Sequence, residues 1–238
     1  MKILAIDSSG LVASVAVAED QTLLGEYTMN YKKTHSQTLL PMIEELTEMI
    51  DLDLETIDAI AVAGGPGSFT GLRIGAATAK GLGLALDKPL IHISTVDGLA
   101  YNYTCTDRLV CPLMDARRNQ TYTGLYRLEG SRLVTLVPQC AVPVEEIIAT
   151  VNETGQPVIF LGDGVPVFQE ILDREVKVPY EYAPLHMSRQ RAGAVAALAM
   201  QYYAEGKTLH ARDFVPDYLR LSQAERERME REKAKEQD

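Results

Sequence analysis

The sequence predicts an α/β protein made of two halves that repeat one order of strands and helices. Three observations lead to this fold. Apolar strands alternate with segments of helical periodicity. Both halves run as three meandering strands, helix, strand, helix, strand and helix. In each half a glycine turn follows a later strand, at 64–67 and at 162–164. Duplicated units of this order indicate two ribonuclease H-like halves that face each other across a cleft.

The first half opens with strands and a helix. Three apolar stretches are typical of strands, at residues 2–7, 14–19 and 22–29. A helix is predicted from Thr34 to Ile50, where Thr34 and Gln37 fit a capping box. Pro41 lies inside this stretch, so it should kink the helix or shift its effective start.

The rest of the first half holds the most glycine-rich stretch of the chain. We expect a strand at 57–63, the glycine turn, a helix at about 70–86, a strand at 89–94 and a short helix near 96–103. Helix 70–86 contains Gly75, Gly81 and Gly83. Glycine costs a helix about 1 kcal/mol relative to alanine, so these residues need a reason such as close packing against another backbone.

The second half repeats the pattern after residue 105. The predicted elements are a strand ending at Asp115, a hairpin around 129–131, a helix at 144–151, a strand at 157–161, a helix at 167–174 and a helix at 188–205. Asp7 and Asp115 therefore occupy equivalent places at the ends of two apolar strands. We divide the chain into halves at 1–105 and 106–221 and a charged tail at 222–238, which is either a solvated helix or a segment that orders on a partner.

Composition excludes several classes of protein. The 238 residues carry a formal net charge of −10, which argues against gripping nucleic acid unaided, although a local basic patch stays open. The three cysteines show no CxxC spacing, which fits a reducing compartment without disulfides. The chain lacks an apolar run long enough for a membrane helix, and the apolar stretch at its start is too short for a signal peptide. We expect a cytoplasmic protein.

Two groups in the first half could bind a nucleotide. Asp7, Ser8 and Ser9 end the first strand, where a carboxylate could hold a magnesium-linked water and the serines could meet phosphate. The alternative is a turn aspartate that satisfies local donors. Gly64, Gly65 and Gly67 could cradle an anion on their N–H groups, or could simply form a tight strand-to-helix turn.

The second half offers a related pair of groups. Asp115 and Arg117, with Arg118, end its first strand and could bind an anionic group through bidentate hydrogen bonds. They could equally form a surface ion pair of little consequence. The turn at 162–164 is a weaker version of the glycine loop.

Other catalytic signatures are missing from the sequence. The stretch at 64–67 is followed by no Walker lysine, and no GxSxG elbow occurs. The four histidines form no HExxH or HxxxH pair, so we assign no metal site. His35 lies in the first turn of a predicted helix, where it is either a capping or surface residue or part of a contact surface.

Several motifs resemble one known family. IDSS at 6–9, HSQTLLPMIEEL at 35–46 and AVAGGPGSFTGLRIGAATAKGLGLAL at 61–86 are similar to the TsaB family, also called YeaZ. LMDARRNQTYTGLY at 113–126 and PDYLRL at 216–221 extend the resemblance to most of the chain.

The resemblance implies a fold and a role. It implies the actin-like ATPase (ASKHA) superfamily with two ribonuclease H-like halves, and a subunit for making threonylcarbamoyladenosine beside the anticodon of tRNAs that read codons beginning with A. It also implies that the paralogue TsaD transfers the threonylcarbamoyl group and that the ATPase TsaE joins the pair. tRNA would be contacted mainly through the complex.

One departure from TsaD bears on catalysis. TsaD carries an HMEGH-type metal motif, and the corresponding stretch here begins at Thr95 and ends at Leu99. Threonine and leucine cannot replace two imidazoles on a divalent ion. The resemblance therefore implies a subunit that is not an enzyme on its own.

The resemblance also implies an interaction surface on the first two helices. It would bind TsaD, or a second copy of the chain when TsaD is absent. The expected contact residues are His35, Leu39, Ile43, Leu46, Arg73, Gly75, Ala76, Ala79, Lys80 and Gly83. Packing inside the chain's own domain is the alternative for the small residues.

A different class of function stays as an alternative, namely an ATP-dependent small-molecule kinase or ATPase of the actin-like superfamily. Its site would be Asp7, the glycine loops and Asp115. We assign no cofactor firmly to this chain, and ATP with Mg²⁺ stays open at the level of the complex.

Overall fold

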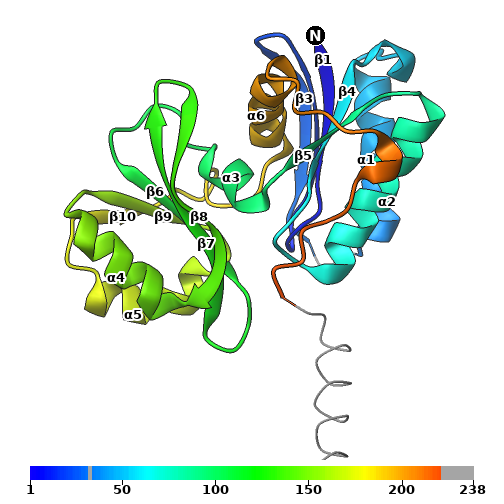
Figure 1. The fold of residues 1–238 in the computed structure, drawn as a ribbon. Coiled ribbons are helices and arrows are strands. Elements are labelled where there is room, and N and C mark those ends of the chain that lie inside the picture. Colours follow the sequence, from blue (N-terminus) through cyan, green and yellow to red (C-terminus); the bar gives the residue numbers. More distant parts are fainter. Residues whose placement is uncertain (32–33, 221–238) are drawn as a thin grey trace, which may run out of the picture.

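Two five-stranded sheets form the two halves of the protein (Figure 1). The computed structural model describes residues 1–31 and 34–220, so the predicted tail at 222–238 lies outside the described residues. The first sheet has the order β3-β2-β1-β4-β5, and the second, read from its β8 edge, has the order β8-β7-β6-β9-β10. In both sheets the meander is antiparallel and the two later strands are parallel. The predicted duplication is confirmed.

The elements of the first half match the predicted order. Its strands are β1 Lys2–Asp7, β2 Ala13–Glu19, β3 Thr22–Met29, β4 Ala59–Ala63 and β5 Leu90–Ile93. Its helices are α1 His35–Met49, α2 Phe69–Ala85 and α3 Thr95–Ala100, with a short 3-10 turn η1 at Leu54–Thr56. Helix α3 is shorter than the predicted range 96–103. It ends at Ala100, and Tyr101 is its C-cap residue.

The second half repeats this order. Its strands are β6 Leu109–Asp115, β7 Gln120–Glu129, β8 Arg132–Pro143, β9 Val158–Leu161 and β10 Tyr180–Tyr182. Its helices are α4 Val144–Thr154, α5 Val165–Glu175 and α6 Ala192–Ala204, and a 3-10 turn η2 follows at Ala211–Asp213.

Strand β1 is buried on both faces because helices cover both sides of the first sheet. Leu4 and Ile6 join the core under α1 and α2, whereas Ile3 and Ala5 pack in the core that contains α6. Side chains alternate between the two faces of a strand, so the apolar residues of β1 contribute to two separate cores. The core around α6 also takes in α3 and one face of the second sheet, and it joins the two halves.

Helix α6 packs on the first sheet although it follows the second half in sequence (Figure 1). Its first turn is capped by that sheet: the Ala192 N–H donates to Ser14 Oγ at 2.8 Å, and the Gly193 N–H donates to Glu26 Oε1 at 3.0 Å. Arg191 forms an ion pair with Glu26 at 2.5 Å. The helix therefore begins at 192 and not at the predicted 188, and the range 106–221 includes a helix that completes the first half.

Helix α1 begins where the sequence predicts, but its cap differs. Thr34 is the N-cap residue, yet its side chain accepts no capping hydrogen bond. The Gln37 N–H donates to the Thr34 carbonyl at 2.9 Å instead. Pro41 stays within the helix, which runs on to Met49. Within residues 1–31 and 34–220, no helix is long and apolar enough to cross a membrane.

Candidate functional site

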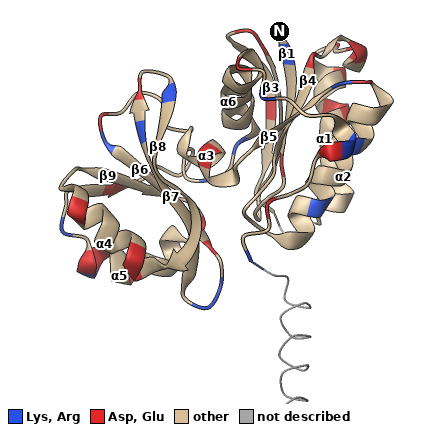
Figure 2. Ribbon diagram, viewed as in Figure 1, with Lys and Arg blue, Asp and Glu red and all other residues tan. Residues whose placement is uncertain are grey.

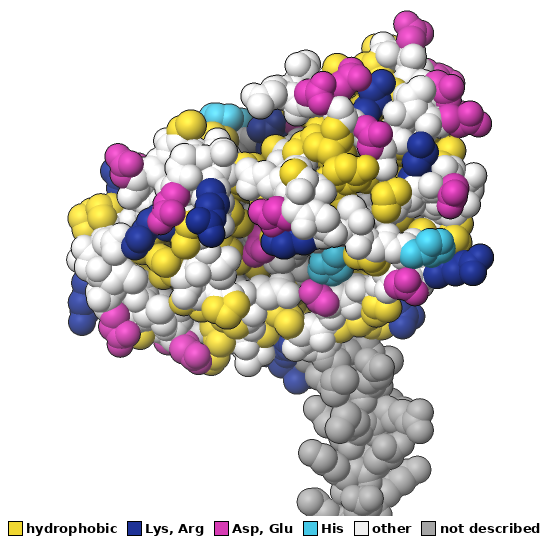
Figure 3. All heavy atoms as spheres, turned by 45° about the horizontal axis from the view of Figure 1, so that its top comes forward, with side chains coloured by type: hydrophobic (Ala, Val, Ile, Leu, Met, Phe, Trp, Pro, Cys, Tyr) yellow, Lys and Arg dark blue, Asp and Glu magenta, His cyan; other side chains and the backbone are white. Residues whose placement is uncertain are grey.

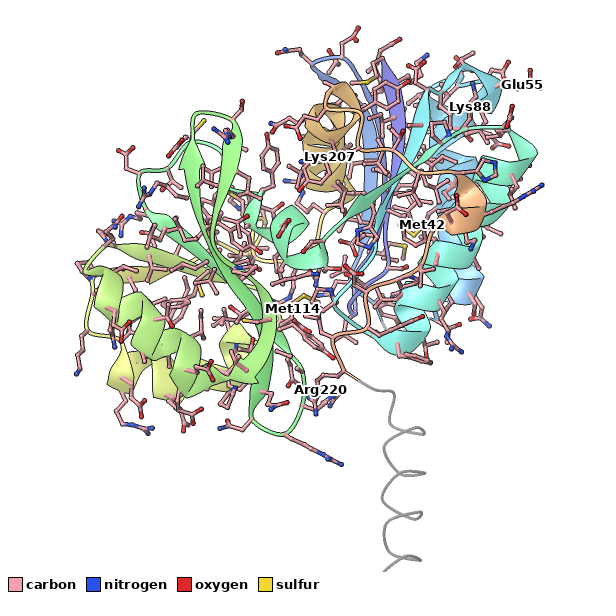
Figure 4. The ribbon with its side chains drawn as sticks, viewed as in Figure 1. Met42, Glu55, Lys88, Met114, Lys207 and Arg220 are labelled. Atoms are coloured by element: carbon pink, nitrogen blue, oxygen red, sulfur yellow. The ribbon has the colours of Figure 1, made fainter. Side chains whose placement is uncertain are left out.

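A cleft of about 380 Å³ opens between the two halves. The first half contributes the loop after β1 and the first turn of α2, and the second half contributes the end of β6 and the turn before α5. Figure 4 labels Met114 where the halves meet and Arg220 at the edge of the cleft, and both line it. The other lining residues include Ser9, Gly67, Phe69, Asp115, Arg117, Asp163, Asp217 and Tyr218.

Asp7 lies at the end of β1 and is only 1% exposed. Its Oδ1 accepts hydrogen bonds from the Ser9 N–H at 2.9 Å and the Ser9 hydroxyl at 2.6 Å. Burial raises the pKa of this carboxyl group to about 6, although the Ser9 bonds and nearby His35 favour the ionised form. Asp7 thus satisfies the donors of its own turn, and it is not among the residues that line the cleft.

Ser8 and Ser9 tie the end of β1 to helix α2. The Ser8 hydroxyl donates to the Gly71 carbonyl at 2.9 Å. The Ser9 carbonyl accepts the Ser68 N–H at 2.7 Å. Ser68 is the N-cap of α2, and its side chain accepts the Gly71 N–H at 3.3 Å. The N–H groups of Ser68, Gly71 and Leu72 at the start of this helix are therefore engaged inside the chain.

The glycine loop is held between two segments of the chain's own backbone. Gly65 has φ +121°, and a Cβ there would collide with the Asp217 carbonyl. A Cβ on Gly67 would collide with the Ser9 carbonyl, and one on Gly64 with the His92 ring. The Asp217 N–H donates to the Gly64 carbonyl at 2.7 Å. These contacts give the glycines a packing role.

The small residues of α2 that were expected at a partner surface lie on its inner face. A Cβ on Gly75 would stand 2.5 Å from Ser8 Oγ, and one on Gly83 would stand 2.5 Å from Leu90 Cδ1. Ala76 and Ala79 are buried in the core beneath the helix. Their size lets α2 approach its own sheet, so the packing alternative explains them.

The expected contact residues of α1 are also corrected. Leu39, Ile43 and Leu46 are each at most 3% exposed and belong to the core of the first half. They cannot touch a partner in this fold. Their helical spacing marks the apolar face, and that face turns toward the sheet because burial of apolar surface stabilises the domain.

Three further residues of the expected surface have partners inside the chain. His35 Nε2 lies 2.8 Å from the Gly10 carbonyl. Lys80 Nζ donates to the carbonyls of Arg212 and Phe214 at 2.9 and 3.0 Å. Arg73 is exposed, and its Cζ lies 4.1 Å from the centroid of the Phe69 ring. Of the residues expected at the surface, only Arg73 is fully exposed.

The opposite face of α2 forms an outer stripe that was not predicted from the sequence. Its exposed residues are Thr70, Arg73, Ala77, Gly81 and Leu84. Among the described residues, no atom lies within 4 Å of the position that a Cβ on Gly81 would take. The signal was available, because these residues repeat at intervals of three or four, offset from the apolar face.

In the second half, Asp115 and Arg117 face the cleft. Asp115 Oδ1 accepts the Arg117 N–H at 2.8 Å, while the Arg117 side chain is 86% exposed and its Nε lies 3.9 Å from Asp115 Oδ2. Asp163 also lines the cleft, and burial raises the pKa of its carboxyl group. Its Oδ1 is buried without a hydrogen-bond partner among the described residues.

Residues 214–220 form a strap that links the two halves. On the first half, Tyr218 lies against Phe69 with ring centroids 4.9 Å apart. On the second half, Arg220 donates to the carbonyls of Ala116 and Arg117. Asp217 Oδ2 accepts the Gln139 amide of β8 at 3.2 Å. Only the PDYLRL motif hinted at a role for this segment, because its contacts are remote in sequence.

No cluster of three or more histidine, cysteine, aspartate or glutamate side chains suited to a metal ion occurs within residues 1–31 and 34–220. Asp115 and Asp163, which both line the cleft and interact electrostatically, come from the second half alone.

Known proteins resemble this chain over nearly its whole length. The family profile described as TsaD: tRNA N6-adenosine threonylcarbamoyltransferase matches residues 22–228. The Bacillus subtilis tRNA threonylcarbamoyladenosine biosynthesis protein TsaB is 34% identical over 233 residues, which cover 98% of this chain and 100% of that protein.

Solved structures agree with the fold. YeaZ from Pseudomonas aeruginosa superposes with a TM-score of 0.79 at 26% identity, over 92% of this chain and 99% of that chain. An inorganic polyphosphate/ATP-glucomannokinase from an Arthrobacter strain superposes with a TM-score of 0.50 at 12% identity, over 84% of this chain and 99% of that chain. At that identity the likeness concerns the fold alone, and it confirms the predicted actin-like architecture of two halves.

Proposed function

This chain belongs to the TsaB family of tRNA threonylcarbamoyladenosine biosynthesis proteins, and from that premise we propose that it is a non-catalytic subunit that binds a TsaD paralogue. In this proposal the paralogue transfers the threonylcarbamoyl group to tRNA, and the ATPase TsaE joins the two proteins in the cytoplasm. This chain keeps the paralogue in a competent conformation.

The packing of the glycine loop carries this proposal. A phosphate cradle needs free N–H groups that point to the ligand. Here the Ser68 N–H is bonded to the Ser9 carbonyl at 2.7 Å, and the Asp217 backbone lies against Gly64 and Gly65. Two of the N–H groups in this turn, those of Gly64 and Ser68, are thus bonded to the chain's own carbonyls of Ile93 and Ser9, which favours a structural role over ATP chemistry.

The positions that correspond to the metal motif of TsaD support the same role. Thr95 and Leu99 are at most 1% exposed, and Leu99 lies in the core that joins the halves. A side chain in that core packs the molecule together and does not face a substrate. We assign no cofactor to this chain, and ATP with Mg²⁺ would act at the level of the complex.

The part of the outer stripe of α2 that follows Arg73, namely Ala77, Gly81 and Leu84, is the surface that we propose for the paralogue. Ala77 and Gly81 make it smooth, and Leu84 adds an apolar side chain that is 48% exposed. Helix α1 lies beside α2 and exposes Leu40 and Met49. Two helices with small and apolar outer residues fit a close pair of helices from a partner. A second copy of this chain would use the same stripe when the paralogue is absent.

Arginine substitutions test this surface. Ala77→Arg and Gly81→Arg point outward, so each should leave the fold intact while weakening the complex with the paralogue more than about tenfold, because a desolvated unpaired charge destabilises an interface. Ala149→Arg on the exposed side of α4 is the matched control and should leave the complex unchanged. Size-exclusion chromatography with the purified paralogue measures the result. Complexes that survive both stripe substitutions would exclude this surface.

Reconstitution tests the function itself. tRNA modification by the paralogue and TsaE should require this chain, and modification at full rate without it would refute the proposal. Calorimetry with ATP and Mg²⁺ tests the competing kinase or ATPase function. Tight binding with turnover by the isolated chain would favour that alternative.

A further inference from the structure

The cleft has a basic and aromatic edge on an otherwise acidic protein. We call it the rim and define it by Phe69, Arg73, Arg117, Arg118, Tyr218 and Arg220. Basic residues stand at the lower end of α2, at the end of the described chain and on the turn between β6 and β7 (Figure 2). The face shown in Figure 3 instead carries acidic and basic side chains intermixed. Because the chain has a net charge of −10, a cluster of four arginines is unexpected.

The first-half side of the rim is a stack of three side chains. Arg73 Cζ lies 4.1 Å from the centroid of the Phe69 ring, and the Phe69 and Tyr218 rings lie 4.9 Å apart at 41°. Tyr218 is 39% exposed. The stack therefore places a partly exposed aromatic ring near a guanidinium group, a combination that suits stacking of a further planar group.

The second-half side is a turn held in an unfavourable conformation. Arg117, Arg118 and Asn119 have φ values of +66°, +57° and +59°, a left-handed run that is rare for residues other than glycine. Such conformations persist only where the surroundings hold them, and they cluster at functional sites.

Three side chains hold this turn. Asp115 Oδ1 accepts the Arg117 N–H at 2.8 Å, and Asn119 Nδ2 donates to Glu145 Oε1 at 3.0 Å. Arg220 from the strap donates to the carbonyl groups of Ala116 and Arg117. With the backbone fixed in this way, the Arg117 and Arg118 side chains are left exposed beside the cleft.

We propose that the rim binds the tRNA directly, with Arg117 and Arg118 on backbone phosphates and the Phe69–Tyr218 stack against an unpaired base. This inference rests on the proposed function for its partner. Arginine matches phosphate with a bidentate fork, and an aromatic pair gives a stacking surface that single-stranded bases share. An acidic protein surface would need the guanidinium groups but not the aromatic stack.

Nearby carboxylates do not cancel the rim's charge entirely. Asp115, Asp163 and Asp217 also line the cleft, and Asp115 Oδ2 lies 3.9 Å from Arg117 Nε. Glu145 is bonded to Asn119. The Arg117 side chain is nevertheless 86% exposed and Arg118 is exposed as well, so both guanidinium groups stay accessible to a phosphate.

Charge reversal tests the phosphate contacts. Fluorescence anisotropy with a labelled tRNA would be measured on the full chain alone and on its complex with the paralogue. The double variant Arg117→Glu/Arg118→Glu should weaken binding about tenfold or more and lower the slope of log affinity against log salt by about 1.5 to 2. The double variant Arg174→Glu/Lys177→Glu changes the net charge equally on an exposed part of the second half that does not line the cleft, and it should change affinity less than about twofold.

The outcomes distinguish tRNA binding at the rim from a general effect of charge and from protein contact. Equal weakening by both double variants would mean that only total charge matters, and would overturn the proposal, as would unchanged binding by the rim variant. Loss of the paralogue with tRNA binding intact would assign the rim to protein contact instead. If no complex forms at all, the proposed function fails while the chain-alone measurement still decides the rim.

A second variant tests the base stack. Tyr218→Leu keeps an apolar side chain but removes the ring, so it should weaken binding of a single-stranded RNA oligonucleotide several-fold and leave binding of inorganic polyphosphate unchanged. Equal affinity of the variant and the parent chain for the oligonucleotide would overturn the stacking part of the proposal.

Discussion

The ends of β1 and β6 occupy the same place in the two sheets, yet they are built in opposite ways. At the end of β1, Asp7 is 1% exposed and bonded to Ser9, and the following glycine loop is covered by the chain's own backbone. At the end of β6, Asp115 faces the cleft and the next turn leaves Arg117 86% exposed.

This difference shows that topology alone does not define a site. Both strands end at an aspartate, and in both halves a glycine turn precedes a helix. The glycine turns are packed in both halves, since a Cβ on Gly162 would stand 2.1 Å from the Leu113 carbonyl, but only the second half leaves its strand-end aspartate and the following charged turn open to solvent. A functional assignment must therefore rest on which N–H groups, carboxylates and guanidinium groups are free, and not on their place in the fold.

Alanine substitutions in the two glycine turns should give the largest changes in the free energy of unfolding. A Cβ on Gly67 would collide with the Ser9 carbonyl, whereas one on Gly164 would stand 2.9 Å from the Leu113 carbonyl. We expect Gly67→Ala to reduce the free energy of unfolding by about 3 kcal/mol or more and Gly164→Ala to reduce it by about 1–2 kcal/mol. Chemical denaturation followed by circular dichroism measures both. A smaller loss of stability for Gly67→Ala than for Gly164→Ala would contradict this comparison.

The buried aspartate should make stability depend on pH. Burial raises the pKa of Asp7 from 3.8 to about 6, so the folded state binds this proton more tightly than the unfolded chain. The protonated Asp7 contributes its full share to the free energy of unfolding below about pH 3.8, and this contribution is lost as the pH rises to about 6. The total loss is about 3 kcal/mol, because one pKa unit corresponds to about 1.4 kcal/mol. Asp7→Asn should flatten this part of the profile. Parallel profiles for the two proteins would contradict the assignment.

The strap should contribute a smaller amount. Arg220→Ala removes the side chain that donates to Ala116 and Arg117, so we expect the free energy of unfolding to fall by about 1 kcal/mol. Arg212→Ala is the control, because its side chain is exposed and its bond to His210 uses the backbone N–H. Thermal unfolding of both variants would measure the difference, and equal losses would show that the strap does not stabilise the second half's open turn.

The smallest change in the free energy of unfolding should appear on the outer stripe, and there the substitution should stabilise the protein. Gly81 lies in α2, and no atom of residues 1–31 and 34–220 lies within 4 Å of the place that an added Cβ would occupy, so Gly81→Ala should stabilise the protein by about 0.5–1 kcal/mol. Gly75→Ala in the same helix should destabilise it, because its Cβ would stand 2.5 Å from Ser8 Oγ. Denaturant midpoints compare the pair, and a loss of stability at Gly81 would show that this face is packed.

The fold followed from the sequence to a large extent, because apolar strands and amphipathic helices report on local burial. The order of elements and their duplication were predicted, and the glycine turns lie where expected. The start of α6 was missed because Ser14 and Glu26, which cap it, stand far away in the sequence. Helix boundaries of this kind depend on tertiary partners that no local pattern reveals.

The candidate site was harder to predict. The sequence identified Asp7, Asp115 and the glycine loop, but not which of them would be covered. Whether Gly65 and Gly67 hold a ligand or the chain's own backbone depends on Asp217 and Ser9, which lie on separate segments. On the helices, periodicity located the apolar faces of α1 and α2, and their assignment to a partner was wrong for Leu39, Ile43 and Leu46 because those faces build the core.

The return of α6 to the first sheet has a consequence for synthesis on the ribosome. Residues 192–204 cover the alanine-rich side of β1, β2 and β4, so that side stays bare while the first half of the chain has already emerged. The second sheet is different, because its five strands lie in the continuous stretch 109–182. The half that is translated first can therefore reach its final packing only after the other half has been translated, which reverses the usual order for a growing chain.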